Sequence, residues 1–445
     1  MTTSIDLLRK RRFLPLFLTQ LLNALNDNLY KNAMVLFVVY QVYDSPAMET
    51  LISGVATAVF VLPFVLFSAT SGQLADMRDK AKIIRWIKFA EIIIMSVGAA
   101  GLLLASEGLQ VETVAIPLMF AALFAMGMHS TFFGPIKYAI LPQHLEKDEV
   151  LAGTGLVEAG TYVAILVGMI LGGAMHIMDS IVAIIGVAVV GYIVCRWVPS
   201  APPEEGTATK VDWNPIRASR DLLAFSMGNL ELRYAVLAIS YFWAIAAILS
   251  VQFIPLAKNV LLADKQVAAV MLVAFSAGIA IGSVSINALL KGDISARYSA
   301  RSVLVLGGLL VSFYLICRGW NLVPQQGPLF GVEEFLTHPL ALVLIANLLL
   351  IAVAGGMFVV PLYAFLTTRV DKSEASRSVA ANNFVSSVFM VVGAGLAGVL
   401  GYFGIPLEEQ LLFSLVLCLL SAQLARKLHA IEDLPKARAA AQKIR

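Results

Sequence analysis

The residues of this chain that are most able to do chemistry lie in its first apolar segment. Polar side chains interrupt the hydrophobic run between Phe13 and Tyr40, namely Asn23, Asn26, Asp27, Asn28, Lys31 and Asn32. Asn23, Asp27 and Lys31 are spaced four residues apart, so a helix places them on one face. A charged side chain at membrane depth costs roughly 2.5–3.5 kcal/mol on insertion scales and is therefore a candidate for function. We predict that this face binds a polar substrate and does not contact lipid.

The composition places the chain in a membrane. Of its 445 residues, 59% are hydrophobic and 14% are charged, which is too apolar for a soluble globular domain. The cysteines all fall in apolar runs and are interpreted as small buried side chains: Cys195, Cys317 and Cys418. The sequence holds no glycine-rich nucleotide loop, no metal-spaced set of His and Cys and no Ser, His and Asp grouping. It therefore predicts no enzyme, no cofactor, no metal site and no nucleic-acid partner.

Twelve apolar runs are long enough to span a bilayer, which takes about 20 residues. They cover 13–40, 50–73, 83–105, 113–140, 152–175, 180–199, 233–257, 267–290, 300–318, 338–363, 377–402 and 407–427. The pattern predicts an all-α integral membrane protein with twelve transmembrane helices.

The loops between these runs alternate in charge. Lys and Arg concentrate at the N-terminus, in every second loop and in the last segment, whereas the other loops are mainly acidic. Because basic residues favour the cytoplasmic side, we expect both termini to be cytoplasmic. A polar stretch at 200–232 then separates a first bundle at 1–199 from a second at 233–428, with a cytoplasmic tail at 429–445. The second part of the stretch suits either a short helix on the inner membrane surface or a solvated linker.

Small residues recur four positions apart in predicted spans 2, 5, 8 and 11. The pairs in spans 5 and 8 are Gly168 with Gly172 and Gly278 with Gly282. Such spacing lets helices approach closely. Ordinary packing explains any one pair, while the recurrence favours two bundles that rock against each other.

The loop after the second span resembles the signature loop of the major facilitator superfamily, commonly G-x-L-A-D-R-x-G-R-K. The match covers Gly72, Leu74, Ala75 and Asp76; Met77 and Asp79 depart from it, and Arg78, Lys80 and Lys82 keep the basic character. A carboxylate at a helix end can accept hydrogen bonds from the N-terminus of a facing helix. We predict a latch of Gly72, Asp76, Arg78 and Lys80 that holds the cytoplasmic side shut; alternatively, these charges only set the topology. The resemblance implies the major facilitator fold of two six-helix bundles.

Four other stretches resemble the bacterial lysophospholipid transporters of the LplT family. They are Leu25 to Asn28, Phe133 to Pro142 followed by Gly155 to Ala159, and Gly355 to Leu362 with Asn382 and Asn383 after it. The resemblance implies a flippase that moves lysophospholipids, such as lysophosphatidylethanolamine, from the outer to the inner leaflet of a Gram-negative inner membrane. It further implies a cytoplasmic acyltransferase as a partner, beside the membrane lipids themselves.

A lysophospholipid carrier needs an apolar track beside a small charged pocket. Lys137 and Glu158 lie in the fourth and fifth predicted spans near the cytoplasmic face, and Asp27 and Lys31 lie further out. We therefore predict a two-level polar track of Asp27, Lys31, Asn23, Lys137 and Glu158. In this hypothesis Lys137 pairs with Glu158 or Asp27 until the substrate phosphate displaces the carboxylate. The alternative is an ion pair that only locks helices together.

Several other polar and aromatic residues have plainer interpretations. Lys88 and Glu91 are expected to form a pair at the inner interface, with the lysine stem along the membrane. His129 is either a proton relay or a satisfied histidine within its bundle. Trp243 is interpreted as part of the interfacial aromatic belt.

Two other functions fit the same sequence. The first is a proton-coupled exporter of amphipathic drugs that uses Asp27 or Glu158 as its proton carrier. The second is a membrane receptor or scaffold for an acyltransferase that transports nothing. The sequence does not distinguish these functions from lysophospholipid transport. Transport that depends on a proton gradient would favour the exporter, and vesicles that show no lipid movement would favour the receptor or scaffold.

Overall fold

The protein is all-helical in the residues that its computed structural model describes, which are 4–38, 42, 46–204, 210–320 and 329–443. The long helices are α2 (Leu14–Phe37), α3 (Pro46–Met77), α4 (Lys80–Ser106), α5 (Ile116–Ala139), α7 (Val150–Ala174), α8 (Ile177–Cys195), α10 (Leu230–Asn259), α11 (Lys265–Leu290), α12 (Ser299–Trp320), α14 (Ala341–Thr368), α15 (Ala375–Tyr402) and α16 (Leu407–Lys443). Short helices connect some of them: α1 (Ser4–Leu7), η2 (Val111–Ala115), α6 (Leu141–His144), α9 (Pro215–Gly228), η3 (Ala296–Tyr298), α13 (Val332–Thr337) and η4 (Lys372–Glu374).

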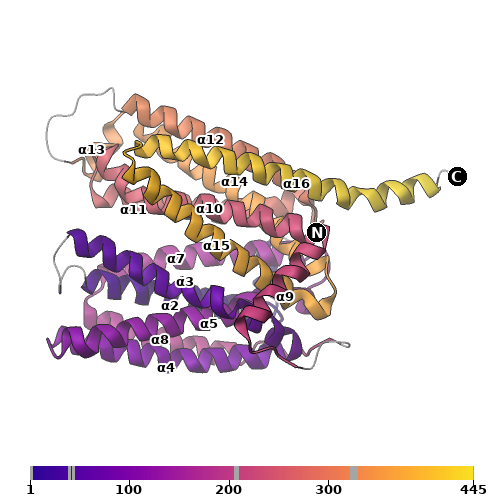
Figure 1. The fold of residues 1–445 in the computed structure, drawn as a ribbon, viewed down its shortest axis with the longest axis horizontal. Helices are drawn as coiled ribbons and strands as arrows, with labels where there is room; N and C mark the ends of the chain where they lie inside the picture. Colours follow the sequence, from indigo (N-terminus) through magenta and orange to yellow (C-terminus); the bar gives the residue numbers. More distant parts are fainter. Residues whose placement is uncertain (1–3, 39–41, 43–45, 205–209, 321–328, 444–445) are drawn as a thin grey trace.

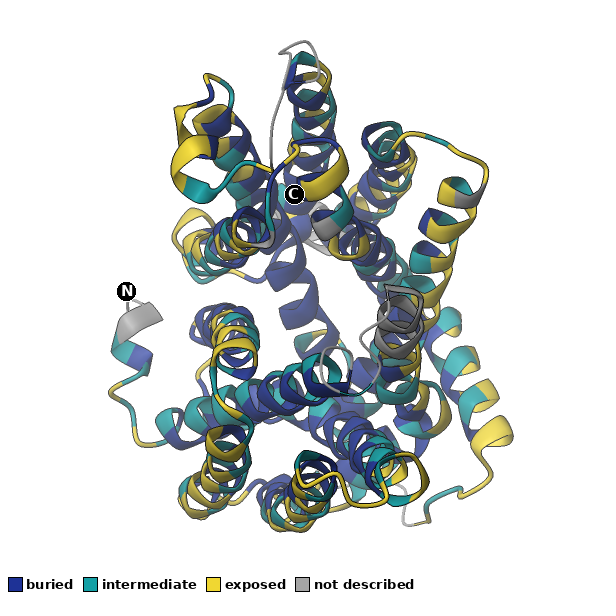
Figure 2. Ribbon diagram, turned by 90° about the vertical axis from the view of Figure 1, so that its left-hand side faces the viewer, coloured by how far each residue is buried: buried dark blue, intermediate teal, exposed yellow. Residues whose placement is uncertain are grey.

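Within the described residues, 11 helices are long and apolar enough to cross a membrane. The long helix outside that set is α2, which has 24 residues but carries the asparagine, aspartate and lysine cluster. Together they confirm the predicted fold of twelve long helices. Large apolar side chains face outward on several of them, as in Trp86 and Val182, which are 73% and 71% exposed. Figure 2 shows this pattern of buried residues between helices and exposed residues around them.

The helices pack in two groups that follow the two halves of the chain (Figure 1). In the first group α2 packs against α7 and α8, α4 against α5 and α8, and α3 against α5. In the second group α11 and α12 pack against α14, and α10 and α12 pack against α16. The groups meet where α7 contacts α11 and α14, and where α15 contacts α3 and α5. The two halves therefore contact each other through α3, α5, α7, α11, α14 and α15.

The repeated glycines pack helices within each group. A Cβ atom added at Gly168 would lie 2.6 Å from the Leu25 carbonyl oxygen of α2, and one at Gly278 would lie 2.4 Å from the Leu349 carbonyl oxygen of α14. The predicted close approach of helices at these pairs is therefore confirmed, and it lies within each group, while the rocking of two bundles stays a prediction. Gly155 does lie between the groups, since its added Cβ would be 2.3 Å from the Ser283 carbonyl oxygen of α11.

The linker contains α9, which packs across both groups. Asn214 caps this helix by accepting hydrogen bonds from the backbone N–H groups of Ile216 and Arg217, both at 3.1 Å. Its buried residues Ala218 and Leu222 form a small core with Ala69 of α3 and with Ala380 and Ala381 of α15. The predicted short helix is thus present, and it touches α15 and the helix α3 that carries Gly72 and Asp76.

Asp79 joins the start of α4 to the beginning of the linker. Its carboxylate accepts hydrogen bonds from Ala81 N (2.9 Å), Ser200 Oγ (2.5 Å) and Ala201 N (3.1 Å). Partial burial raises the pKa of Asp79, but the hydrogen bond from Ser200 and those from the backbone outweigh it and hold this pKa below its ordinary value.

We expect Asp79→Ala to destabilise the protein by about 1 kcal/mol, because it removes a helix N-cap. A group whose pKa is depressed in the folded state stabilises it above its unfolded pKa, so the deficit should be constant above about pH 3.8 and shrink below it. Thermal unfolding in detergent, followed by labelling of the buried cysteines, measures both effects. The exposed Asp293→Asn is a suitable control and should leave the unfolding temperature unchanged.

Candidate substrate-binding site

A cavity of about 300 Å³ lies between the two groups of helices. It is lined from the first half by α2, α3, α5 and α7, and from the second half by α10, α14 and α15. All five residues predicted to bind substrate line it: Asn23, Asp27, Lys31, Lys137 and Glu158. The structure thus brings the two predicted levels into one continuous cavity, while the role of these residues in binding stays a prediction.

Asp27 is held in a fixed orientation at the cavity wall. Ser130 Oγ donates a hydrogen bond to Asp27 Oδ2 at 2.5 Å, and Asn23 Nδ2 donates to the same oxygen at 3.3 Å. Within the described residues, Asp27 Oδ1 receives no hydrogen bond. The helical spacing of Asn23 and Asp27 explains their contact, whereas nothing in the local sequence indicates Ser130, which comes from α5.

The predicted ion pair of Lys137 is absent among the described residues, and that prediction was wrong. Glu158 instead accepts a hydrogen bond from the hydroxyl of Tyr138, the residue directly after Lys137. Lys137 Nζ lies 4.9 Å from the centroid of the Tyr138 ring and lines the cavity. The tyrosine satisfies the carboxylate, so the ammonium group remains available to an anion in the cavity.

Lys31 also lacks an ion pair with Asp27 in the described structure. Its Nζ lies 5.8 Å from the centroid of the Phe60 ring of α3, and the side chain lines the cavity. The cavity therefore presents two ammonium groups and two carboxylates. Its remaining wall includes apolar side chains: Phe60, Val61, Phe64, Phe133, Ile165 and Met390.

An aromatic layer joins the two halves at the level of Glu158. The rings of Tyr138 in α5 and Tyr363 in α14 stack with centroids 4.7 Å apart and planes inclined by 14°. Trp243 Nε1 donates a hydrogen bond to the Tyr363 hydroxyl at 2.9 Å, and all three side chains line the cavity. The interpretation of Trp243 as a membrane-belt residue was wrong, because its place on α10 faces inward. Whether Trp243 faces the cavity or the lipid depends on the rotation of α10 about its axis, which its sequence does not specify.

Two of the predicted latch residues, Gly72 and Asp76, lie against the start of α15. Asp76 accepts hydrogen bonds from the backbone N–H groups of Ser376 (2.9 Å) and Arg377 (3.0 Å). A Cβ atom added at Gly72 would be 2.6 Å from Ala380 Cβ, so only glycine permits this approach. Lys80 is buried beside them, and its backbone N–H donates to Ala201 O at 3.0 Å.

Arg78 follows the end of α3, is exposed and makes no polar contact in the described residues, so its part in the latch is a prediction with no contact to support it. A latch function of the other three residues stays a prediction.

These features agree with comparisons to known proteins. The family model of the Major Facilitator Superfamily matches residues 16–332, which is more than half of the chain. The chain belongs to the major facilitator superfamily. The twelve-helix fold and the signature loop both fit this membership, which indicates a multi-pass membrane transporter.

Curated relatives extend the similarity along most of this major facilitator protein. It is 26% identical to the lysophospholipid transporter LplT of Escherichia coli O1:K1 / APEC over 400 residues, which cover 87% of this chain and 88% of that protein. LplT of Escherichia coli strain K12 / DH10B is 25% identical over the same shares. The resemblance expected from the sequence motifs is therefore confirmed.

Solved structures show the same fold at low sequence identity. A bacterial homologue of the iron transporter ferroportin, in an outward-facing state, superposes with a TM-score of 0.73 and 13% identity over 95% of this chain and all of that one. The human organic anion transporter MFSD10 gives a TM-score of 0.72 and 14% identity over 93% of this chain and 99% of that one.

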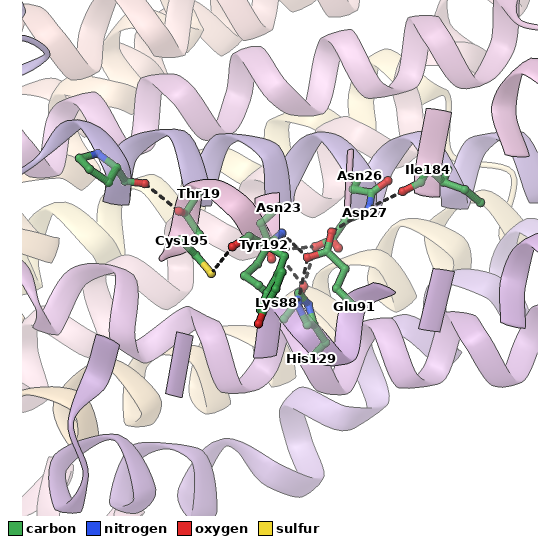
Figure 3. A network of polar contacts seen from close by, with 12 residues as sticks. Thr19, Asn23, Asn26, Asp27, Lys88, Glu91, His129, Ile184, Tyr192 and Cys195 are labelled. Atoms are coloured by element: carbon green, nitrogen blue, oxygen red, sulfur yellow. Dashed lines mark hydrogen bonds and ion pairs between the residues drawn. The ribbon is translucent and has the colours of Figure 1, made fainter. Parts of the chain in front are cut away.

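A second polar group of this major facilitator protein is buried within its first half (Figure 3). Lys88 and Glu91 of α4 form an ion pair with both side chains fully buried. His129 Nε2 lies 3.3 Å from Glu91 Oε2, and Asn26 Nδ2 donates to Glu91 Oε1 at 2.7 Å. The expected pairing of Lys88 with Glu91 is therefore confirmed, but its expected place at the inner interface was wrong, since these residues face α2 and α5 and not the membrane surface. His129 has its partner within the bundle.

We expect Asp76→Asn to open the cytoplasmic side of the transporter about 5- to 10-fold more often. The amide loses the negative charge that favours a helix N-terminus and one of two hydrogen bonds to backbone N–H groups. Labelling of Asn383→Cys with a membrane-impermeant maleimide from the cytoplasmic side, after the three native cysteines are replaced, measures opening. Asp293→Asn, an exposed carboxylate in the equivalent loop of the second half, is the matched control. Equal labelling of both variants contradicts the latch.

Proposed function

We propose that this protein moves lysophospholipids, such as lysophosphatidylethanolamine, from the outer to the inner leaflet of a bacterial inner membrane by alternating access. The observation that carries the proposal is the cavity between the halves, in which the Lys137 ammonium group is available beside two carboxylates and an apolar wall. The similarity to LplT proteins supports the same substrate class. The product then becomes available to a cytoplasmic acyltransferase.

The groups in the cavity match the parts of such a lipid. The phosphate is placed at Lys137, with Lys31 as a second cation on the outer side. The head-group amine is placed at Asp27, whose Oδ1 receives no hydrogen bond within the described residues. The single acyl chain follows Phe60 and Phe64 of α3. A charged pocket and an apolar track thus lie side by side.

The moving units in this proposal are residues 1–199 and 233–428, joined by the linker at 200–232. The contacts of Asp76 with α15 and of Gly155 with α11 support a state that is closed toward the cytoplasm. The cavity then exchanges substrate with the outer leaflet. Both termini and the tail at 429–445 lie on the cytoplasmic side, where the basic loops also lie.

Uptake of labelled lysophosphatidylethanolamine into proteoliposomes tests the function. We expect uptake without ATP and without a proton gradient, and we expect Asp27→Asn to reduce it about 10-fold, because the amide no longer pairs with the head-group amine. Asp293→Asn makes the same change at an exposed carboxylate outside the cavity and is the matched control. Absence of lipid movement in the wild type contradicts the proposal and favours a scaffold.

The second candidate is a proton-coupled exporter of amphipathic compounds. The observation in its favour is that the cavity contains two carboxylates, Asp27 and Glu158, at positions open to substrate. It predicts that transport requires a proton gradient and that Asp27→Asn or Glu158→Gln removes this requirement. Uptake that is equal with and without the gradient excludes it.

A further inference from the structure

A separate basic hollow lies between η3 with the start of α12 and the second half of α16, away from the central cavity. It has a volume of about 290 Å³ and is lined by Ala296, Arg297, Ala300, Arg301, Arg426, His429 and Ala430. The two helices pack against each other along their lengths (Figure 1). The hollow lies at the same end of the molecule as the latch, because the neighbouring Glu432 contacts Arg369 at the end of α14, shortly before α15 begins.

The charge of the hollow is strongly positive. Arg297, Arg301 and Arg426 are exposed, and no ion pair of theirs is found among the described side chains. The nearby carboxylate of Glu432 is engaged elsewhere. It accepts hydrogen bonds from Ser295 Oγ and Ala296 N, both at 3.1 Å, and from Arg369 at 3.4 Å, and lies 3.5 Å from His429 Nδ1. Three arginines therefore line a space whose described lining contains no carboxylate.

An apolar surface continues from the hollow toward the membrane centre. On α12, Val305 is 56% exposed and follows Arg301 by four residues, so the two lie on one helix face. On α16, Leu419 and Val416 are exposed and precede Arg426 by about two and three turns. A molecule with an anionic head and apolar tails fits this sequence of surfaces. Free phosphate fits only the hollow.

We propose that this hollow binds the phosphate group of an anionic phospholipid of the inner leaflet, with its acyl chains along Val305 and Leu419. Arginine suits this role because its planar guanidinium group donates paired hydrogen bonds to phosphate oxygens. Basic pockets between transmembrane helices on the cytoplasmic side bind such head groups. The site is distinct from the transport cavity and holds a lipid that is not transported.

Native mass spectrometry of the full chain in neutral detergent tests the proposal. The probes are phosphatidylglycerol, phosphatidylcholine and inorganic phosphate. We expect phosphatidylglycerol to bind at least about tenfold more tightly to the wild type than to the triple variant Arg297→Gln, Arg301→Gln, Arg426→Gln. The matched control removes three exposed cations elsewhere on the cytoplasmic side, Lys147→Gln, Arg196→Gln and Arg220→Gln, and should bind like the wild type.

Each alternative result overturns part or all of this proposal. Equal phosphatidylglycerol affinity in the triple variant and the wild type shows that the hollow is not the binding site. Equal affinity for phosphatidylcholine and phosphatidylglycerol contradicts an anionic ligand, and displacement of phosphatidylglycerol by millimolar inorganic phosphate reassigns the hollow to free phosphate. If the triple variant does not fold, Arg301→Gln alone provides the comparison, and there a loss of about threefold or more is expected. Transport of lysophospholipid should continue in every folded variant.

Discussion

Replacing Lys137 by methionine should reduce lysophospholipid uptake by about 10- to 100-fold, the largest loss among single changes in the cavity. A hydrogen bond to a charged group contributes about 1.5–3 kcal/mol, which corresponds to this range in binding. In the described structure Lys137 has no ion pair, so its charge is available to the phosphate of the substrate. Initial uptake rates in proteoliposomes, together with lysolipid affinity from a binding assay, measure the loss.

Two controls separate substrate binding from stability. Lys31→Met is the same change in the same cavity but at its outer side, and we expect a smaller loss of about threefold, because its ammonium is one of two cations. Lys137→Arg keeps the charge and should retain most of the binding. Unchanged uptake by Lys137→Met contradicts the assignment, whereas lost uptake with a lowered unfolding temperature assigns Lys137 a structural role.

Replacing Lys88 by methionine should lower the free energy of unfolding by about 3–5 kcal/mol, the largest expected effect on stability. Removing one partner of a fully buried ion pair leaves the other charge without compensation. Glu91 would keep only His129 and Asn26, and neither carries a fixed positive charge. Thermal unfolding followed by labelling of the buried cysteines reports the change.

The double variant Lys88→Met, Glu91→Leu tests the origin of this loss. Exchanging a buried ion pair for apolar side chains of similar volume is often neutral or stabilising, so the double variant should recover much of the stability. The exposed pair Arg217 and Asp212 in the linker is the contrasting case. Breaking it with Arg217→Met should cost much less stability than Lys88→Met, because water already solvates both charges. A similar loss from Lys88→Met and Arg217→Met contradicts the buried-charge argument.

The twelve helices could be predicted from the sequence because hydropathy depends on length and composition alone. The latch contact of Asp76 and the inward position of Asp27 also followed from local patterns, which were a signature loop and a four-residue spacing. What failed was the pairing of side chains between helices. Lys137 and Glu158 are complementary in charge, but the hydroxyl of Tyr138 reaches the carboxylate instead.

The wrong predictions share a physical cause: the sequence does not specify how each helix is rotated about its axis or how deep its residues lie in the membrane. Lys88 and Glu91 occur near one end of an apolar run, where charged side chains at the membrane surface have the lowest free-energy cost. The rotation of α4 turns them toward α2 and α5, where His129 and Asn26 complete their contacts. Trp243 was misplaced for the same reason. Composition determines that a helix spans the membrane, but packing with its neighbours determines which side faces a cavity.

The position of α9 adds a mechanical condition to the transport cycle. Ala218 and Leu222 of this helix are buried against α3 and α15, the two helices that separate in the proposed alternating access when the cytoplasmic side opens. The linker therefore restrains the two halves. On opening, α9 must lose its contacts with α3 or α15, which exposes part of that small core to water. Each cycle breaks and remakes this contact, so the amino acids of the linker set part of the activation barrier for substrate release.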